Sequence, residues 1–333
     1  MNIREMIEER EAQFLSPRAQ LSAKSKGRER TEVESDIRAC FQRDRDRIIH
    51  SKSFRRLKHK TQVFLSPEGD HYRTRLTHTL EVSQVARTVS RALSLNEDLT
   101  EAIALAHDLG HSPFGHTGED AWQPPYTDRK FEHHEQSVRV VQVLEHGGEG
   151  LNLSWEVVDG IRCHVEELMP ATLEGRVVRL ADRIAYINHD IEDALMAGIL
   201  REKDLPADLI AVLGLVGSVR INNMVLDLIK NSTDEDDIRM SAGMYESMEA
   251  MKAYLFENVY VGSQAKTEEA KAAGVLRSLY SYYIEHPDQL PEEQGAAVGA
   301  DLPTRVIDYL AGMTDPFALK KYTHLFMPGV WEG

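Results

Sequence analysis

The chain has 333 residues, 42% of them hydrophobic, which is enough to bury a sizeable core. Its longest apolar runs, such as AIALA and LIAVLGLVG, are too short to span a membrane, and two cysteines are too few for a disulfide framework. A net charge of −15 argues against a general polyanion binder, and the N-terminus lacks the apolar stretch of a secretory signal. We therefore expect a cytoplasmic protein that has no membrane partner.

Helical periodicity runs through the whole chain, and no alternating run is long enough to build a sheet, so we expect an all-α fold. Residues 1–40 are predicted to form an N-terminal helix and an extended segment. Residues 41–205 are predicted to form the catalytic core, because twelve of the fourteen histidines lie between His50 and His189. Residues 206–333 are expected to add a C-terminal helical region packed on this core.

A basic stretch lies at the start of the predicted core. Residues 43–75 hold ten Lys or Arg residues against four acids, although the chain as a whole is acidic. Such a stretch is either the solvated face of a basic helix or a binding site for an anion. The sequence leaves both interpretations open.

The first histidine of interest stands in RLTHTLEVSQVARTVSRAL. Helical spacing of Leu80, Val85, Val89 and Ala92 predicts a helix that lines the core, with His78 near its start.

The next predicted helix, EDLTEAIALAHDLG, has apolar residues at Leu99, Ile103 and Ala106. Gly110 is expected to end it in a left-handed cap, which places His107 and Asp108 in the last turn. Neighbouring residues on a helix point in different directions, so this pair can share one ion only at the helix end.

A third predicted helix, GRVVRLADRIAYINHDIEDAL, carries a polar stripe at spacings of three or four residues: Asp182, Tyr186, His189, Asp190 and Asp193. A stripe that faces solvent would be ordinary. A stripe that faces the His78 helix would complete a site of two histidines and two aspartates. That ligand set suits Mn²⁺, Fe²⁺, Zn²⁺, Ni²⁺ or Mg²⁺ and leaves positions for water and substrate.

These motifs together carry a family resemblance. The order His78, His107-Asp108, Asp182 resembles the HD superfamily of metal-dependent phosphohydrolases. The segments FQRDRDRIIHSKSFRRLKHKTQVF, RTRLTHTLEVSQVAR, ALAHDLGHSPFGHTGE and RLADRIAYINHDIEDA resemble the deoxyguanosine triphosphate triphosphohydrolase (dGTPase) family. The resemblance implies an HD-domain helical core that hydrolyses a deoxynucleoside triphosphate at the α-phosphorus, which yields deoxynucleoside and tripolyphosphate. It also implies one divalent metal ion, held by His78, His107, Asp108 and Asp182.

The resemblance assigns further residues to the reaction. It implies catalytic roles in proton transfer and water positioning for His116, Glu119, His134 and Glu135. It implies substrate contacts, to the phosphate or the sugar or close to the metal ligands, for Gln62, Arg75, His111, Tyr186 and Asp190. His133, beside His134, is interpreted as structural. The basic residues Arg55, Arg56, Lys58 and Lys60 are expected to hold the distal phosphates.

Two other interpretations stay open. Another HD phosphohydrolase, such as a 5′-nucleotidase or phosphodiesterase, would use the same metal ligands. A non-catalytic HD protein would instead bind nucleotides or single-stranded nucleic acid through residues 43–75, although the net charge does not indicate a nucleic-acid partner. The expected partners are deoxynucleoside triphosphates, as substrate and as a candidate activator, and further copies of the chain, since relatives assemble into oligomers.

Overall fold

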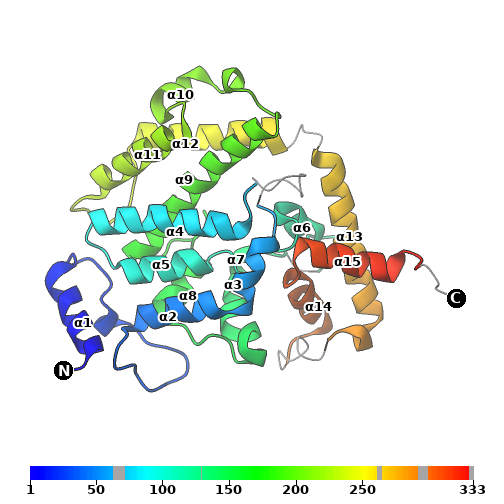
Figure 1. The fold of residues 1–333 in the computed structure, drawn as a ribbon, viewed down its shortest axis with the longest axis horizontal. Helices are drawn as coiled ribbons and strands as arrows, with labels where there is room; N and C mark the ends of the chain where they lie inside the picture. The colour runs from blue at the N-terminus through cyan, green and yellow to red at the C-terminus, as the bar shows by residue number, and fades with distance from the viewer. Residues whose placement is uncertain (63–71, 129, 261–264, 292–298, 330–333) are drawn as a thin grey trace. The chain divides into compact units, whose positions relative to one another are not determined.

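The computed structural model describes residues 1–62, 72–128, 130–260, 265–291 and 299–329 (Figure 1). Within these ranges it contains fifteen α-helices and no β-strand, which confirms the predicted all-α fold. The chain divides into two compact units with interleaved segments. Unit 1 comprises Met1–His50, Thr77–His107 and Asn152–Ser263, and unit 2 comprises Ser51–Leu76, Asp108–Leu151 and Gln264–Gly333. The division into residues 1–40, 41–205 and 206–333 stays a prediction about the sequence.

The helices of unit 1 are α1 (Ile3–Phe14), α2 (Cys40–His50), α4 (Arg75–Ala92, whose first two residues belong to unit 2), α5 (Glu97–Ala106), α8 (Trp155–Arg162), α9 (Leu173–Met196), α10 (Ala207–Leu213), α11 (Gly217–Ser232) and α12 (Ala242–Leu255). Those of unit 2 are α3 (Lys52–Arg56), α6 (Gly115–Ala121), α7 (His133–Arg139), α13 (Ala265–Glu285), α14 (Leu302–Ala311) and α15 (Asp315–Phe326). No single described helix is long and apolar enough to cross a membrane; α10 and α11 pass that test only together, and they are bent by 61° at their break.

Helix α5 is the central helix of unit 1. The Asn96 side chain caps its first turn by accepting a hydrogen bond from the Leu99 N–H (3.2 Å), and Glu97 and Asp98 suit the positive end of the helix dipole. Seven of its ten residues are buried, because α2, α8 and α9 all pack against it. Figure 1 shows α2 and α5 running alongside each other. This helix therefore delivers His107, its C-terminal cap, to the interior of unit 1.

Helix α4 carries His78 one turn from its start, as predicted. Its buried apolar residues are Val82, Val85, Ala86 and Val89. The expectation that Leu80 and Ala92 line the core is wrong, because both side chains are exposed. Leu80 lies about 200° around the helix from Val82, so it cannot share the buried face.

The polar stripe of α9 faces the interior. The Thr172 side chain caps this helix by accepting from the Gly175 N–H (3.1 Å). His189, Asp190 and Asp193 are buried, so the alternative of a solvent-facing stripe is excluded for this part of the helix.

Unit 2 is built around α13, which packs against α6, α14 and α15. Its core contains several aromatic side chains, and Trp122 and Tyr283 are among the largest fully buried side chains of the described chain. Asp315, at the start of α15, accepts hydrogen bonds from the Thr61 N–H (2.9 Å) and the Phe114 N–H (3.0 Å). One carboxylate thus joins three segments of unit 2 that are far apart in the sequence.

The turn after α5 differs from the prediction. Helix α5 ends at Ala106, and Gly110 does not adopt the left-handed conformation expected of a helix cap. Gly110 is instead required by a close approach within unit 2, because a Cβ atom there would lie 2.1 Å from the Ser137 backbone nitrogen. Its own N–H donates to Ser137 Oγ (2.9 Å). The residues 108–111, which we call the HD turn, are therefore pressed against α7.

Candidate functional site

Two groups of histidines and carboxylates stand out, one in each unit. The unit 1 cluster comprises His78, His107 and Asp182, contributed by α4, α5 and α9. His78 Nε2 lies 3.0 Å from Asp182 Oδ1, and His107 Nε2 lies 3.7 Å from the same oxygen. Both histidines are 1% exposed. The structure therefore brings together three of the four predicted metal ligands within one unit.

The proton on His107 can be placed from its surroundings. Its Nδ1 atom lies 2.8 Å from the Ala104 carbonyl oxygen, which can only accept a hydrogen bond. Nδ1 therefore carries the proton in the neutral ring, and Nε2 presents its lone pair toward Asp182.

A longer relay orients His78 in the same way. His189 Nε2 lies 2.7 Å from Glu81 Oε2, and His189 Nδ1 lies 3.3 Å from His78 Nδ1. If His189 donates from Nε2 to the carboxylate, its Nδ1 accepts the proton of His78 Nδ1. His78 Nε2 is then left with a lone pair that faces Asp182. A carboxylate that orients a ligand through a second group is typical of the surroundings of protein metal sites.

The donor atoms of the unit 1 cluster are arranged as a metal ion would require. Two imidazole lone pairs and one carboxylate converge, and they would repel one another without a cation between them. Without a metal ion, burial raises the pKa of Asp182, but hydrogen bonds and positive charge from protonated His107 and His78 rings outweigh it and hold the pKa well below its usual range. A cation bound between the neutral rings would replace that stabilisation of the carboxylate. Mixed nitrogen and oxygen ligands suit a divalent transition metal or Mg²⁺. The donor set fits a metal ion and does not identify which one.

Asp108 and Arg75 form an ion pair in unit 2. Asp108 follows His107 in the chain and is the first residue of its segment. Arg75 donates from Nη1 to Asp108 Oδ2 (2.6 Å), and both residues are buried. The guanidinium Nε of Arg75 is also buried and has no hydrogen-bond partner among the described residues. This donor is available to a ligand.

The unit 2 cluster comprises His111, His116, Glu119 and His133. His133 donates from its backbone N–H to Glu119 Oε1 (3.1 Å), and its Nδ1 lies 3.3 Å from both carboxylate oxygens. His116 Nδ1 lies 3.6 Å from Glu119 Oε2. The rings of His111 and His133 stack at 4.8 Å between centroids. Glu119 therefore contacts His133 more closely than it contacts the predicted catalytic His116.

The titratable groups of this cluster have pKa values that are shifted in different directions. Burial lowers the pKa of His111 well below its usual range, and the nearby Arg75 adds to the effect. Burial also lowers the pKa of His133, but the hydrogen bond to Glu119 outweighs it and leaves the pKa raised. Burial raises the pKa of Glu119, yet its bonds to His116 and His133 hold the pKa far below its usual range. His116 is 74% exposed, so its ring meets solvent.

Local backbone strain shapes the segment that carries His116. Phe114 precedes α6 in the left-handed region (φ 62°), and Gly115 follows with φ 58°. A Cβ atom on Gly115 would lie 3.2 Å from the Gln62 carbonyl and 3.5 Å from the Arg75 guanidinium. A non-glycine residue in the left-handed region is costly and often marks a functional turn. The bond from the Phe114 N–H to Asp315 helps to hold this conformation.

The remaining predicted residues lie in three places. The Gln62 side-chain oxygen is buried in unit 2 without a hydrogen-bond partner among the described residues. Tyr186 and the buried Asp190 lie on the inward stripe of α9 in unit 1. In α7, His134 is buried and its Nε2 lies 4.0 Å from Glu135 Oε1, while Glu135 is half exposed.

Three residues in these clusters were not predicted. His133 was interpreted as structural, although it is the closest ring to Glu119. The helical spacing of α9 places His189 in the polar stripe without giving it a partner, and it gives Glu81 no role. The signal for Glu81 was present in the sequence, because it lies three residues after His78 and so falls on the same face of α4.

Comparison with known proteins identifies the family. The HD domain model matches residues 75–187, and the phosphohydrolase-associated domain model matches residues 238–324. A deoxyguanosinetriphosphate triphosphohydrolase-like protein of Caldanaerobacter subterraneus subsp. tengcongensis is 56% identical over 99% of this chain and 98% of its own. Proteins of the same description from Desulfatibacillum aliphaticivorans (98% and 99% covered) and Clostridium perfringens strain SM101 (98% and 98% covered) are each 48% identical. The chain belongs to this family.

Membership in the deoxyguanosinetriphosphate triphosphohydrolase-like family confirms the resemblance seen in the sequence. The HD domain match begins at the first residue of α4 and ends within α9, so it contains all four predicted metal ligands. The phosphohydrolase-associated match covers α12 to α15 almost completely, including the aromatic core helices of unit 2.

Proposed function

We propose that the protein is a cytoplasmic, metal-dependent deoxynucleoside triphosphate triphosphohydrolase. Water attacks the α-phosphorus, the bond from that phosphorus to O5′ of the sugar breaks, and the products are deoxynucleoside and tripolyphosphate. The observation that carries the proposal is the convergence of two histidine lone pairs on the Asp182 carboxylate. The printed names of the relatives, which describe triphosphohydrolase-like proteins, support the choice of reaction.

The metal ion is assigned to His78, His107 and Asp182, with Asp108 as the fourth ligand because it follows His107 in the chain. When bound, a divalent ion neutralises phosphate charge and lowers the pKa of coordinated water. Its identity among Mn²⁺, Fe²⁺, Zn²⁺, Ni²⁺ and Mg²⁺ is left open.

Arg75 is assigned to the phosphate groups. It already pairs with Asp108 and retains a buried Nε donor without a partner among the described residues. A phosphate oxygen would accept from that donor in a charge-assisted hydrogen bond. The buried Gln62 oxygen is an acceptor in the same unit, and we assign it to the 3′-hydroxyl of the sugar.

Proton transfer is assigned to His116 with Glu119. The reaction removes a proton from water and delivers one to the departing O5′, and a histidine has the pKa range for either step. His116 is exposed and therefore accessible to a substrate, while the ionised Glu119 holds its ring. We assign His134 and Glu135 to positioning of the water, and His111 to the shell of groups around the phosphate.

Tyr186 and Asp190 are assigned to the sugar. The Tyr186 ring, packed beneath C2′, would leave no room for a 2′-hydroxyl and so select deoxynucleotides. Burial raises the pKa of Tyr186, which keeps the phenol neutral and able to donate a hydrogen bond.

Product analysis tests the proposal directly. Metal-loaded protein is incubated with each deoxynucleoside triphosphate, singly and in mixtures, and the phosphate products are identified by ³¹P NMR. Mixtures are included because we propose that a deoxynucleotide also acts as activator on an oligomer of the chain. Tripolyphosphate is the expected product. Release of orthophosphate or pyrophosphate would favour another HD phosphohydrolase, and no product in any mixture would favour a non-catalytic binder.

A further inference from the structure

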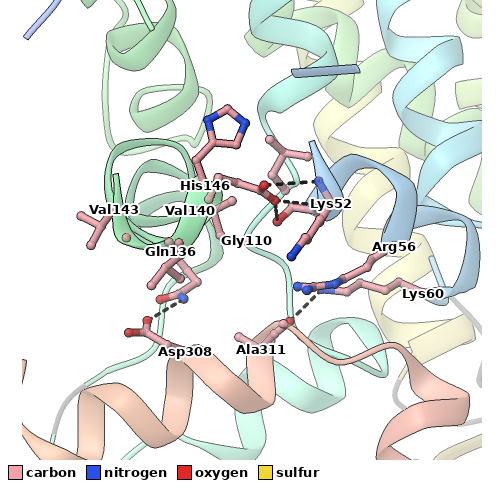
Figure 2. Close-up of a pocket in the computed structure, with 17 residues that line it drawn as sticks. Lys52, Arg56, Lys60, Gly110, Gln136, Val140, Val143, His146, Asp308 and Ala311 are labelled. Atoms are coloured by element: carbon pink, nitrogen blue, oxygen red, sulfur yellow. Dashed lines mark hydrogen bonds between the residues drawn. The ribbon is translucent and has the colours of Figure 1, made fainter. Parts of the chain in front are cut away.

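Unit 2 contains a cavity of about 440 Å³ (Figure 2). It includes Arg56 and Lys60, which the sequence assigned to the distal phosphates of the substrate; that assignment stays a prediction, and the roles proposed above do not use these two residues. All of its lining residues belong to unit 2. They come from α3 and the turn after it, from the HD turn, from α7, the π-helical turn Val140–Leu144 and the 3-10 turn Glu145–Gly148, and from the end of α14. The cavity therefore borders the same turn that carries His111.

Three cationic side chains gather at one part of this cavity: Lys52, Arg56 and Lys60. Figure 2 shows their charged ends directed toward one another. Lys60 is 2% exposed, and its Nζ donates to the carbonyls of His111 (2.5 Å) and Ala311 (2.8 Å). Within the described residues, neither the Lys52 amine nor the Arg56 guanidinium has a hydrogen-bond or ion-pair partner.

Among the described residues, the two carboxylates that line the cavity form no ion pair with these three cations, although the charge of Glu145 offsets part of the charge of Arg56. Glu145 accepts from the backbone N–H groups of Lys52 (3.3 Å) and Ser53 (2.7 Å) and from Ser53 Oγ (2.6 Å). Asp308 lies at the other end, where it accepts two hydrogen bonds from Arg139 (2.7 Å each) and one from Gln136 (3.0 Å). Each carboxylate is thus occupied by other donors.

Burial and mutual repulsion make the charged forms of these side chains less favourable. Burial, reinforced by Arg56 and Arg75, lowers the pKa of Lys60 to about 7. Burial also lowers the pKa of Arg56, against the opposing influence of Glu145. An anion between the three side chains would remove this cost and accept the donors that have no partner.

We propose that this cavity binds a small phosphate monoester, with its phosphate held by Lys52, Arg56 and Lys60. A bare phosphate would fill only a small part of about 440 Å³. The wall formed by Leu109, Val140, Val143 and Leu144 is apolar, so it suits a compact apolar group attached to the phosphate. The ligand is coupled to the HD turn, because Lys60 also holds the His111 carbonyl.

The test is calorimetric titration of the full-length, metal-loaded protein with methylphosphonate and with phenylphosphonate. Neither probe can be hydrolysed, and they differ only in their apolar group. The variants are Lys52→Glu and Arg56→Gln, and the matched control is Lys320→Glu, which makes the same charge change at an exposed residue of α15 outside the cavity. Lys52 is exposed, so its variant is expected to fold even if Arg56→Gln does not.

We expect Lys52→Glu and Arg56→Gln each to weaken binding of both probes by about tenfold or more, the usual effect of losing a charge-assisted bond. Lys320→Glu should bind as the wild type does. Phenylphosphonate should bind more tightly than methylphosphonate.

Three results would overturn the proposal. Equal weakening by Lys320→Glu would indicate general attraction of anions by surface charge. Unchanged binding in both cavity variants would place the anions elsewhere, including at the catalytic cluster. Equal affinity for the two phosphonates would remove the assigned apolar contact. None of these results bears on whether deoxynucleotides are hydrolysed, so failure here leaves the proposed reaction untouched.

Discussion

The two histidine clusters contain the same residue types but differ in the groups that determine which ring nitrogen carries a proton. In the unit 1 cluster, the Ala104 carbonyl and the Glu81–His189 relay leave each ligand histidine with one lone pair toward Asp182. In the unit 2 cluster, Glu119 is shared by two rings, one of which is exposed to solvent. A histidine with a fixed tautomer suits a metal ion, while a histidine that shares a carboxylate and meets solvent suits proton transfer.

This comparison assigns cation binding to the unit 1 cluster, with Asp108 as a further proposed ligand, and proton transfer to the unit 2 cluster. Residue type alone would not separate the two roles. The separation predicts that substitutions in the two clusters cause the loss of different properties, namely bound metal and turnover.

The largest effect is expected from Asp182→Ala. Without the carboxylate, the two histidine lone pairs have no anionic partner for a shared cation, so both bound metal and turnover should fall below detection. Metal content by mass spectrometry and tripolyphosphate release measure the two properties separately. Asp208→Ala, at an exposed aspartate of α10, is the control and should keep both.

Asp108→Ala extends this test to the fourth ligand. If the chain neighbour of His107 completes the set, the variant should also lose the metal. Full metal occupancy in Asp108→Ala would remove this residue from the ligand set and leave it only as the partner of Arg75.

His116→Ala is expected to lose roughly a hundredfold or more in kcat, the usual scale for a positioned acid or base, and to keep its metal. His324→Ala, at an exposed histidine of α15, is the matched control and should turn over normally. Wild-type kcat in His116→Ala would shift the proton role to His133, which lies closer to Glu119. Loss of metal in this variant would break the separation between the clusters.

Substitutions in the Glu81–His189 relay, which orients His78, should lower the metal affinity by an intermediate amount. Replacing His189 by Ala removes the hydrogen bond that orients His78, and replacing Glu81 by Gln weakens the charge-assisted bond to His189; such changes typically cost about tenfold to a hundredfold in metal affinity. Competition titration with a chelator measures this affinity without reference to turnover. An unchanged metal affinity in both variants would show that His78 keeps its orientation without the relay.

The sequence predicted those parts of the site that helical spacing controls. The polar stripe of α9 and the place of His107 at the end of α5 follow from the three- and four-residue spacings of their own helices, and the structure confirms them. The face of α4 was placed wrongly because Leu80 and Val85 were assumed to share one side, and apolar residues occur on both sides of that helix.

Contacts between distant segments could not be predicted in this way. The contact of Glu119 with His133 spans 14 positions, and that of Glu81 with His189 joins α4 to α9. Local helix rules predict a left-handed cap at Gly110, yet a glycine is required there because the backbone of α7 approaches closely. Such pairs depend on how helices pack, and a single sequence carries no periodic signal for packing.

The smallest expected effect concerns stability, through the lysine that holds the HD turn. Burial lowers the pKa of Lys60 to about 7, below the value near 10.5 expected in the unfolded chain. Between these two values the unfolded state binds more protons than the folded state, so the stability contributed at this position rises with pH. Below about pH 7 the lysine is charged in both states and its full burial cost remains.

The free energy of unfolding of the wild type, relative to Lys60→Met, should therefore increase by about 2 kcal/mol from pH 7.5 to 9.0. Urea denaturation at the two pH values measures it, and Lys58→Met, at an exposed neighbour, should show no such increase. If the difference in free energy of unfolding between the wild type and Lys60→Met does not change with pH, the buried Lys60 amine keeps its proton through this range. The positive charge at the cavity of unit 2 would then already be compensated.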